Sequence, residues 1–365
     1  MKICFLSYNL TNGGAQRVAS VLCNDLVNRH EVLVIVKERT EKEYAVDPRV
    51  KVVSMDEESE KFRNARHKDL AAISVLRKIY KREKPDYVMA FLGCSEASHI
   101  AALGIKGLHY IATIQNSPWS KPESRFRRLT RDISAVTSEA CMVQNHEQAT
   151  YFPQWAQKKL FIVRNPVDPM YINCQEHEYR PLRKMVSLGR LHDQKNQEMM
   201  IEAFALAADD MDPQVQLEIY GDGPKKEKLH RMLEEKGLTD RIHIYPFHSK
   251  PLELYQSADA FILSSNYEGM PNALLEAMTV GLPCITTDCK TGPKDIIRDG
   301  ENGFLVPMNQ PEIMAEKIRY LASHPEDGER MGRAAREDVL ASYVLETVSR
   351  NLEQDLMRIG SRHGR

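Results

Sequence analysis

Two glutamates eight positions apart, Glu268 and Glu276, stand on either side of a turn that leads from a buried strand into a helix. Gly269 and Pro271 force the turn, and Asn272 is expected to cap the helix. A helix N-terminus carries a partial positive charge, which favours a phosphate group nearby. One glutamate can therefore bind a sugar and the other a ribose, with phosphates between them.

Two cations, Arg190 and Lys195, lie in a loop that follows the apolar run 184–188. Arginine presents a bidentate fork to phosphate oxygens and lysine presents a point charge, so the two can flank a diphosphate. Taken alone, the segment fits a solvated loop about as well as a diphosphate-binding loop.

A third candidate phosphate contact is the turn Asn12-Gly13-Gly14-Ala15, which opens a helix expected over 15–26. Adjacent glycines let a phosphate approach backbone N–H groups. A purely structural turn is an equal alternative. The complete Gly-x-Gly-x-x-Gly fingerprint is absent, which argues against a nicotinamide-dependent dehydrogenase.

Short, nearly continuous apolar runs recur along the chain and alternate with helical patterns, as is typical of strands buried on both faces of a parallel sheet. In the first half the runs are residues 3–7, 31–37, 50–55, 87–91, 110–115, 141–145 and 160–164. In the second half they are residues 184–188, 214–220, 241–247, 260–265, 284–287 and 303–306. Helices are expected between them, for example over 198–208, 225–236 and 273–280.

The segment Asn165-Pro166-Val167-Asp168-Pro169 interrupts this alternation. Two prolines in five residues exclude helix and central strand, so an interdomain linker is expected there. The sequence thus predicts an α/β fold of two doubly wound, Rossmann-like domains, residues 1–165 and 166–344, facing a central cleft. An amphipathic helix at 345–359 has no strand after it, and the tail 345–365 is expected to pack back onto the first domain.

The composition fits a protein of two domains. The chain has 365 residues and a formal net charge of -1, which argues against bulk binding of nucleic acid. Its seven scattered cysteines contain no Cys-x-x-Cys pair and indicate reduced, buried thiols in a cytoplasmic protein. No run of ~18 apolar residues is present, so membrane contact would be peripheral.

In order along the chain, the motifs resemble those of retaining glycosyltransferases of family four, which have the GT-B fold. They are Gly13-Gly14, Arg190 with Lys195-Asn196, Gly221-Asp222-Gly223-Pro224, Tyr255–Asp259, Glu268-x7-Glu276, Gly281-Leu282-Pro283, Gly292-Pro293 and Asp299–Val306. The resemblance covers nearly the whole chain and is densest from Val186 to Val306. It extends to enzymes that transfer N-acetylhexosamine or hexose to glycans linked to polyprenyl diphosphate.

The resemblance implies catalytic roles for Arg190, Lys195 and Glu268. The two cations and the N–H of Gly14 would bind the donor diphosphate, Glu268 the donor sugar and Glu276 the ribose. The loop Phe247-His248-Ser249 would meet the base. The implied donor-binding residues are Gly13, Gly14, Phe247, His248, Gly269, Met270, Pro271, Asn272, Ala273, Leu274 and Glu276.

In one place the chain departs from the family. Many members carry a histidine in the loop after the strand at 110–115, where this chain has Gln115-Asn116-Ser117. Asn116 stays a candidate contact for sugar or acceptor, but neither amide can act as a base.

The segment 119–136 combines Trp119, a Ser120-Lys121-Pro122-Glu123 capping box and an amphipathic helix. Its expected apolar stripe is Phe126, Leu129, Ile133 and Val136. Its expected opposite, basic face is Arg127, Arg128 and Arg131, with Arg125 at the margin. Such a face is often only solvated. The alternative is contact with acceptor or membrane, through anionic lipid or a lipid-linked diphosphate.

No metal is expected. Asp210-Met211-Asp212 matches the Asp-x-Asp pattern of metal-dependent glycosyltransferases of another fold, but it follows a helix and precedes Pro213, so a solvated turn is expected. Arg190 and Lys195 would instead stabilise the departing diphosphate. Double displacement needs two carboxyl groups ~5–5.5 Å apart. Because the resemblance assigns Glu276 to the ribose, we expect a same-face attack in which the departing phosphate takes the acceptor's proton.

The expected activity is retaining transfer of an N-acetylhexosamine or hexose from a UDP-sugar to a lipid-linked or polysaccharide glycan. The UDP-sugar is a co-substrate and no cofactor is expected. The protein would be cytoplasmic and peripheral at the inner face of the cytoplasmic membrane. The alternatives are a nucleotide-sugar epimerase or phosphorylase of the same fold and a non-catalytic nucleotide-sugar-binding module.

Overall fold

The computed structural model describes residues 1–11, 13–40, 43–64, 68–91, 95–122, 124–248 and 250–361. Backbone contacts divide the chain into two compact units. The N-terminal unit comprises Met1–Pro166 with Leu345–Arg365, and the C-terminal unit comprises Val167–Val344. This division lies one residue from the boundary expected from the sequence.

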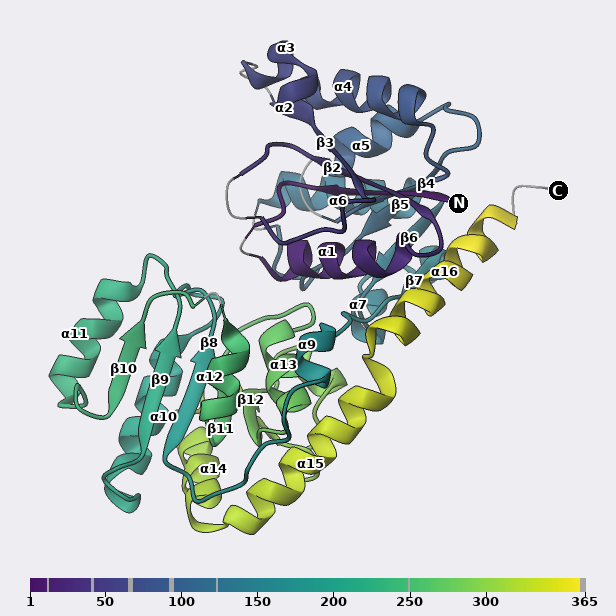
Figure 1. Ribbon diagram of the computed structural model, residues 1–365. Helices are drawn as coiled ribbons and strands as arrows, with labels where there is room; N and C mark the ends of the chain where they lie inside the picture. Colours follow the sequence, from purple (N-terminus) through teal and green to yellow (C-terminus); the bar gives the residue numbers. More distant parts are fainter. Residues whose placement is uncertain are drawn as a thin grey trace. The chain divides into compact units, whose positions relative to one another are not determined.

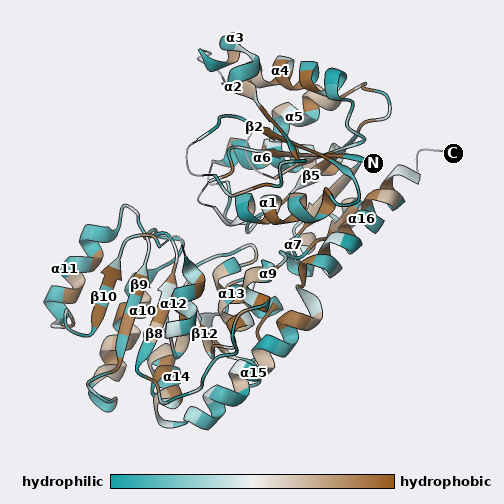
Figure 2. Ribbon diagram, in the orientation of Figure 1, coloured by the Kyte–Doolittle hydropathy of each residue, from teal (hydrophilic) through white to brown (hydrophobic). Residues whose placement is uncertain are grey.

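The N-terminal unit is built on seven parallel strands in the order β3-β2-β1-β4-β5-β6-β7. They are β1 (Lys2–Ser7), β2 (Glu31–Val36), β3 (Lys51–Ser54), β4 (Tyr87–Ala90), β5 (His109–Thr113), β6 (Ala140–Val143) and β7 (Leu160–Ile162). In β1, Ile3 and Phe5 enter one hydrophobic core, while Cys4 and Leu6 enter another. Both faces of the sheet are covered, which explains why the strands are apolar at nearly every position (Figure 2).

Helices form the two covering layers of this sheet. They are α1 (Gly14–Leu26), α2 (Met55–Glu58), α3 (Glu60–Arg63), α4 (Lys68–Glu83), α5 (Ser95–Ala102), α6 (Arg125–Thr137), α7 (His146–Thr150), α8 (Gln154–Gln157) and α16 (Leu345–Ser361). The helices α1 and α16 lie side by side over one face (Figure 1), and α4 and α5 contribute to the core on the other.

The C-terminal helix α16 belongs to the N-terminal unit, as the sequence indicated, and is two residues longer than expected. Its Leu352 and Leu356 are fully buried in the core that β1 and α1 share. Arg29, in the turn just after α1, donates from Nε to Glu353 Oε2 at 3.1 Å. Apolar burial and an ion pair thus hold this distant segment to the first residues of the chain.

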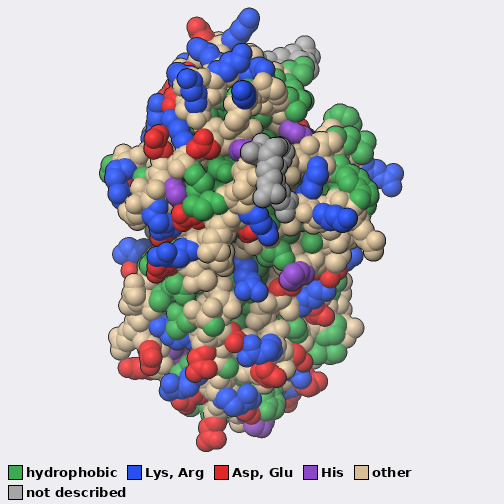
Figure 3. All heavy atoms as spheres, turned by 90° about the vertical axis from the view of Figure 1, so that its right-hand side faces the viewer, with side chains coloured by type: hydrophobic (Ala, Val, Ile, Leu, Met, Phe, Trp, Pro, Cys, Tyr) green, Lys and Arg blue, Asp and Glu red, His purple; other side chains and the backbone are tan. Residues whose placement is uncertain are grey.

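One buried carboxylate in the N-terminal unit is paired with two cations. The buried carboxylate of Glu83 accepts hydrogen bonds from Lys51 Nζ at 2.8 and 2.7 Å and from Arg82 Nε at 2.8 Å. Burial alone would raise the pKa of Glu83, but the bonds from Lys51 and Arg82 outweigh it and lower the pKa to about 2. On the face in Figure 3, basic and acidic side chains are intermixed over much of the surface.

The C-terminal unit has six parallel strands in the order β10-β9-β8-β11-β12-β13. They are β8 (Lys184–Leu188), β9 (Gln216–Tyr220), β10 (Ile242–Tyr245), β11 (Ala260–Leu263), β12 (Cys284–Thr287) and β13 (Phe304–Val306). The helical segments are α9 (Pro169–Ile172), α10 (Gln197–Ala207), η1 (Ala208–Asp210), α11 (Lys226–Lys236), α12 (Pro251–Ser257), α13 (Asn272–Val280), η2 (Pro293–Asp295), α14 (Pro311–Ser323) and α15 (Pro325–Ser342).

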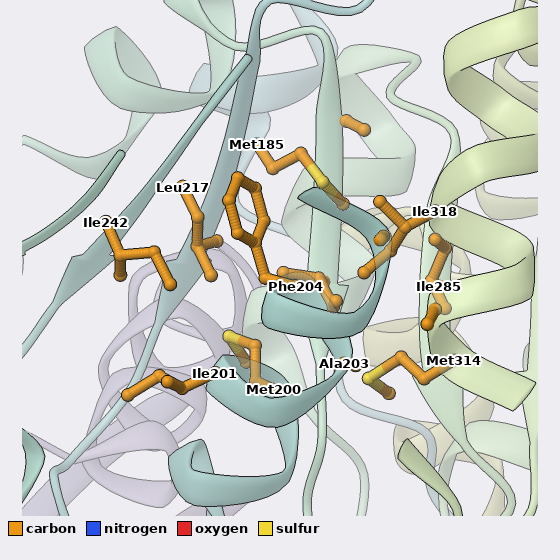
Figure 4. Packing of buried hydrophobic residues seen from close by; sticks show 14 of the residues in the cluster. Met185, Met200, Ile201, Ala203, Phe204, Leu217, Ile242, Ile285, Met314 and Ile318 are labelled. Carbon is orange, nitrogen blue, oxygen red and sulfur yellow. The ribbon is translucent and has the colours of Figure 1, made fainter. Parts of the chain in front are cut away.

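One core of this unit lies between the sheet and α10 with α14. Phe204 of α10 packs among Met185 and Leu217 of the sheet and Ile318 of α14 (Figure 4). Both units contain the strand order 3-2-1-4-5-6, counted from the first strand of each, which is that of doubly wound dinucleotide-binding folds. The predicted α/β fold class, with two Rossmann-like sheets, is confirmed.

The expected linker is only partly irregular. The units divide between Pro166 and Val167, but Pro169 begins the short helix α9. Asp168 caps this helix by accepting from the N–H of Met170 at 3.0 Å. The expectation that two prolines exclude a helix here was wrong, because proline is well tolerated in the first turn, where its missing N–H has no partner in the helix.

The six cysteines in the described ranges are free thiols, and all of them except Cys174 are buried. Cys94 lies outside those ranges. Among the described helices, none combines the length and the apolar character needed to cross a bilayer.

Candidate functional site

The strand order of the C-terminal unit reverses between the neighbouring strands β8 and β11. In open α/β sheets, ligands bind beyond the carboxyl ends of the strands at such a switch point. The loop after β8 carries Arg190 and Lys195, and the loop after β11 carries Glu268. Lys195 Nζ lies 2.6 Å from Glu268 Oε1. The fold thus pairs two side chains that the resemblance assigned to different parts of a ligand.

Among the described residues, three side chains donate to the carboxylate of Glu268. Lys195 Nζ and Ser265 Oγ each lie 2.6 Å from Oε1, and Gln194 Nε2 lies 3.4 Å from Oε2. The side chains of Glu268 and Lys195 are only 7% and 15% exposed, so each charge depends on the other for compensation. Since the described donors bind Oε1 more closely, Oε2 is the oxygen better able to accept a further hydrogen bond.

The two loops are also joined through their backbones. Asn266 N–H donates to Gln194 O at 2.8 Å, and Ser264 Oγ donates to Lys195 O at 2.9 Å. Asn196, the cap of α10, has a left-handed backbone with φ of 47°, which asparagine tolerates better than most residues. These contacts fix the direction in which Lys195 leaves the backbone.

Sequence reasoning missed Gln194, Ser265 and Asn266 as parts of this site. Gln194 and Ser265 contact Glu268 directly, and Asn266 joins the loops. A signal was present, because polar residues cluster after two apolar runs that become neighbouring strands. Sequence spacing does not reveal which strands are neighbours.

Arg190 is exposed on the same loop. Its Nη2 lies 3.3 Å from Gln194 Oε1, while the amide nitrogen of Gln194 contacts Glu268. Arg190, Gln194, Glu268 and Lys195 therefore form one connected polar row. The exposed guanidinium at one end is well suited to bind an anion.

The turn Gly221-Asp222-Gly223-Pro224 supports the loop of Arg190. A Cβ on Gly221 would lie 2.0 Å from Gly189 O, and one on Gly223 would lie 2.3 Å from Leu191 O. Only glycine allows the two loops to approach this closely.

The helix α13 begins differently from the expectation. Its N-cap is Pro271, and Asn272 is the first helical residue, so the prediction that Asn272 caps the helix was wrong. Proline has no side-chain acceptor, and no side chain in the described ranges caps this N-terminus. The N–H groups of Leu274 and Leu275 turn back to Pro271 O at 3.1 and 3.2 Å.

A second loop packs tightly against the segment Glu268–Pro271. Thr291 Oγ1 donates to the backbone carbonyl of Glu268. Gly292 has φ of +95°, and a Cβ there would lie 2.9 Å from both Gly269 O and Pro271 Cδ. Gly269, Met270 and Pro271 are buried, so this stretch is enclosed between α13 and the Thr291-Gly292 turn.

Glu276 lies in the second turn of α13 and is buried. Its Oε2 accepts a hydrogen bond from the hydroxyl of Tyr255 at 3.1 Å, and Tyr255 is itself fully buried in α12. Ala273 and Leu274 lie between the helix start and this carboxylate. The two glutamates therefore have different partners, Lys195 for Glu268 and Tyr255 for Glu276.

The proposed base-binding loop follows β10. Phe247 is 56% exposed, and its N–H donates to Asp222 Oδ2 at 3.0 Å. His248 meets Tyr220 edge-on at 6.1 Å between ring centroids, and Tyr220 stacks on Tyr245 at 5.0 Å. Aromatic surface is thus available beside the Gly221–Pro224 turn. Ser249, also expected in this loop, lies outside the described residues.

In the N-terminal unit, Gly13 is the N-cap of α1 and Gly14 is its first residue, one position earlier than expected. Gly13 has an extended backbone with φ of -146°, and the atoms closest to an added Cβ belong to the flexible side chain of Gln16. The fold itself therefore does not demand glycine at position 13. This helix N-terminus has no side-chain cap, and Asn12 lies outside the described residues.

The amides that replace the family histidine are engaged within the same unit. Gln115 Oε1 accepts from Gln144 Nε2 at 3.2 Å, and Asn116 Oδ1 accepts from the N–H of Ser117 at 2.7 Å. The carbonyl of Asn116 lies 3.4 Å from Gln148 Nε2. Asn116 thus shapes its own loop, at the carboxyl end of β5.

The amphipathic helix α6 starts at Arg125 with Ser124 as N-cap. No helix starts at the capping box expected at Ser120. The N–H groups of Ser120 and Lys121 turn back to Ser117 O instead. Glu123 lies outside the described residues. Trp119 is half-buried and meets Tyr151 edge-on at 5.2 Å.

The expected basic face of α6 is only partly exposed in the structure. Arg131 is only 13% exposed, because it donates to the carbonyls of Pro118 and Lys121. Arg128 lies 3.3 Å from the carbonyl of Pro122. Both hold the preceding loop, whereas Arg125 and Arg127 are exposed. The predicted basic face is therefore divided, because Arg128 and Arg131 turn to the preceding loop while Arg127 is exposed. Phe126, Leu129 and Ile133 of the predicted apolar stripe face solvent.

Asp210 and Asp212 have arginine partners. Arg183 pairs with Asp212, and Arg319 Nη1 lies 3.6 Å from Asp210 Oδ2. Within the described ranges, no group of three or more histidine, cysteine, aspartate or glutamate side chains is arranged to hold a metal ion.

Family models match both halves of the chain. The model described as "Glycosyltransferase Family 4" matches residues 12–170, and that described as "Glycosyl transferases group 1" matches residues 175–338. The two matches correspond closely to the two units.

Relatives of the chain carry names of sugar transferases. A Campylobacter jejuni protein named GalNAc-alpha-(1->4)-GalNAc-alpha-(1->3)-diNAcBac-PP-undecaprenol alpha-1,4-N-acetyl-D-galactosaminyltransferase is 27% identical over 88% of this chain and 89% of its own length. The poly(ribitol-phosphate) alpha-N-acetylglucosaminyltransferase of Staphylococcus aureus is 29% identical over 44% of this chain and 32% of its own length.

Solved structures share the fold. A mutant of S. aureus TarM, in complex with fondaparinux, alpha-GlcNAc-glycerol and UDP, superposes with a TM-score of 0.80 at 14% identity, over 98% of this chain and 99% of that chain. Anabaena Alr3699/HepE, in complex with UDP and glucose, gives 0.79 at 18% identity, over 98% and 100%. With both units matched by glycosyltransferase models and the whole fold shared with these structures, the chain belongs to the GT-B glycosyltransferases of the group 1 and family 4 type.

Proposed function

We propose that this glycosyltransferase transfers a sugar from a UDP-sugar to a lipid-linked or polysaccharide glycan with retention of anomeric configuration. The observation that carries the proposal is the row Arg190, Gln194, Glu268 and Lys195 at the switch point of the C-terminal sheet. The row combines an exposed cation, a buried cation and a carboxylate with one weakly bound oxygen. This set suits a sugar joined to a diphosphate.

The donor assignment rests on the loops around that row. The N-terminus of α13 lacks a side-chain cap and lies next to Glu268 in the chain, so its partial positive charge favours the phosphates. Glu268 Oε2 would accept from a sugar hydroxyl and Glu276 from the ribose. Phe247 and His248 would contact the base. The Gly13-Gly14 turn of the N-terminal unit is the further proposed phosphate contact.

The identity of the donor is proposed from the relatives. Both of the similar structures named above are complexes with UDP, and one of them also holds glucose. The names of two relatives specify transfer of N-acetylgalactosamine or N-acetylglucosamine. We therefore favour a UDP-N-acetylhexosamine, and a glycan on polyprenyl diphosphate as the acceptor.

In the proposed reaction the bond between the anomeric carbon and the diphosphate breaks, and negative charge develops on the departing UDP. Arg190 and Lys195 stabilise that charge without a metal. Lys195 keeps its contact with Glu268, so the lysine links the sugar-binding carboxylate to the leaving group. The acceptor hydroxyl attacks from the face that UDP leaves, and its proton passes to the departing phosphate.

The N-terminal unit is the proposed acceptor domain, with Asn116 and the surface of α6 as candidate contacts. A cytoplasmic location, at the inner face of the membrane, suits an acceptor on polyprenyl diphosphate. Free thiols that are mostly buried agree with a reducing compartment.

The test is to incubate the purified protein with UDP-N-acetylhexosamines and a polyprenyl-diphosphate-linked glycan, then to determine the new linkage by NMR. We expect an α-linked product from the α-linked donor, in the presence of EDTA as well as in its absence. A β-linked product would overturn retention. Loss of activity in EDTA that Mn2+ restores would overturn the proposed role of the two cations. An epimer formed from donor alone would favour an epimerase.

A further inference from the structure

The motif Tyr255–Asp259 is shared with the family pattern, yet the proposed function gives it no role. It runs from α12 to the residue before β11. Tyr255 is fully buried and Asp259 is 5% exposed. Buried polar side chains need hydrogen-bond partners, so the partners of these two residues indicate what each one does.

The partners of Asp259 lie around the first residue of β8. Its Oδ2 accepts hydrogen bonds from the N–H groups of Arg183 and Lys184 at 2.9 and 2.8 Å. Its other oxygen is engaged by Arg180. These contacts are at the amino end of the strand, whereas the candidate site lies beyond its carboxyl end. Asp259 therefore stabilises the sheet.

Tyr255 is directed to α13 instead. Its hydroxyl donates to Glu276 Oε2 at 3.1 Å. The ring lies between two aromatic neighbours, Tyr171 of α9 at 6.0 Å and Phe261 of β11 at 5.9 Å between ring centroids, and meets both edge-on. Because packing from two other elements holds the ring, the position of the hydroxyl is fixed as well.

The carboxylate of Glu276 needs such a fixed donor. The side chain is 6% exposed, and the neighbouring residues of α13 from Leu274 to Val280 are buried with it. The terminal torsion of a glutamate is broad, so its own geometry does not decide the plane of the carboxylate. A hydrogen bond to Oε2 does, and it leaves acceptor capacity, since a carboxylate can accept about four hydrogen bonds.

We propose that Tyr255 is a positioning residue for recognition of the nucleotide. Its hydroxyl sets the carboxylate plane of Glu276 so that both oxygens meet the 2′ and 3′ hydroxyls of a ribose. The inference rests on the proposed function, in which Glu276 binds the ribose, and it identifies the pair that makes the site select a ribonucleotide. A site built to bind a hydroxyl strongly rejects an analogue that lacks it.

The structure supplies a conservative variant and a matched control. Tyr255→Phe removes the hydroxyl and keeps the ring in its aromatic surroundings. Tyr320→Phe makes the same change in α14, where the hydroxyl donates to Asp327 Oδ2 of α15 at 2.6 Å. Both variants lose a hydrogen bond from a phenol to a carboxylate, but only the first loses it at Glu276. Thermal unfolding followed by circular dichroism checks that each variant folds.

Binding of UDP and of 2′-deoxy-UDP is measured by calorimetry. The wild type should bind UDP at least about tenfold more tightly than the deoxy analogue. Tyr255→Phe should raise the Kd for UDP about tenfold and that for 2′-deoxy-UDP less than about threefold, because the analogue makes only one of the two hydroxyl contacts. In turnover of the UDP-sugar, the donor KM should rise while kcat stays within about twofold. Tyr320→Phe should behave like the wild type.

Equal weakening of UDP and 2′-deoxy-UDP in Tyr255→Phe would overturn the inference, since that is the result expected of a hydroxyl that only supports the fold. Unchanged or tighter binding of UDP would overturn it as well. In a Glu276→Ala background, Tyr255→Phe should change the Kd for UDP by less than about twofold. A tenfold loss there would mean that Tyr255 does not act through Glu276.

The wild type separates this inference from the function on which it rests. A wild-type protein that does not bind UDP, or that binds UDP and 2′-deoxy-UDP equally, would overturn the proposed donor site and the role of Tyr255 together. A wild type that prefers UDP, with the same preference in Tyr255→Phe, would overturn the role of Tyr255 alone.

Discussion

Replacing Lys195 by alanine should destabilise the C-terminal unit as well as reduce activity. The change leaves the carboxylate of Glu268, 7% exposed, without its cationic partner. Removing one member of a buried ion pair typically costs about 3–5 kcal/mol. Since Ser265 and Gln194 still donate to the carboxylate, we expect the lower end of that range, ~3 kcal/mol.

For a unit of this size, a loss of that magnitude lowers the thermal midpoint by about 6–12 °C. The assay is thermal and urea unfolding followed by circular dichroism. Lys250→Ala is the matched control, because it removes an exposed lysine paired with Glu253 at 3.1 Å and should cost less than about 1 kcal/mol.

The double variant Lys195→Ala/Glu268→Gln removes both charges and should recover much of the lost stability, while remaining inactive. The reasoning is refuted if Lys195→Ala unfolds at the wild-type midpoint. It is also refuted if the double variant loses more unfolding free energy than the two single variants lose together. Either result would mean that the charges do not depend on each other.

Four further outcomes are expected. Arg190→Ala should lower kcat by about 10²–10³-fold, the scale for losing one stabiliser of developing charge, with an unchanged unfolding midpoint because the side chain is exposed. Glu276→Gln should chiefly raise the donor KM, since a ribose contact is alike in ground and transition states. Steady-state kinetics test this, and a lowered kcat with an unchanged donor KM would contradict it. Gly292→Ala should abolish donor binding measured by calorimetry, while circular dichroism should show that the fold persists. An alanine is strained at a φ of +95°, and its Cβ would lie 2.9 Å from Gly269 O and Pro271 Cδ, so the Gly269–Pro271 turn would be displaced. Glu83, whose pKa is lowered to about 2, stabilises the fold at pH values above its ordinary pKa. That contribution is lost as the pH falls from about 5 to 2. Glu83→Gln should therefore reduce the dependence of the free energy of urea unfolding on pH in this range.

The fold could be predicted closely because a buried parallel strand must be apolar at most positions. The runs 184–188 and 284–287 coincide with β8 and β12, and the other apolar runs differ from their strands mainly at the ends. The alternation with helices then leaves few topologies. The short helix at Pro169 was missed because a proline that ends one element can begin another.

The site could be predicted only in part, because the identity of a residue does not reveal its partner. The sequence singled out Glu268, Lys195 and Arg190 as candidates, but the pairing of Lys195 with Glu268 depends on β8 and β11 being neighbours. The sequence did not show which residues of α6 face the fold, for a related reason. An amphipathic pattern defines two faces, and here the bonds of Arg131 to the carbonyls of Pro118 and Lys121 decide which face turns inward.

The return of α16 to the first unit has a consequence for how this protein is made. Val348, Leu352, Leu356 and Ile359 complete the core beside α1, yet the ribosome makes them only after the whole C-terminal unit. The nascent N-terminal unit must therefore keep part of its apolar surface uncovered while Val167–Val344, a continuous insertion, folds first. We expect chains truncated before Leu345 to be retained by chaperones or degraded, even though every residue of the proposed donor site is present in them.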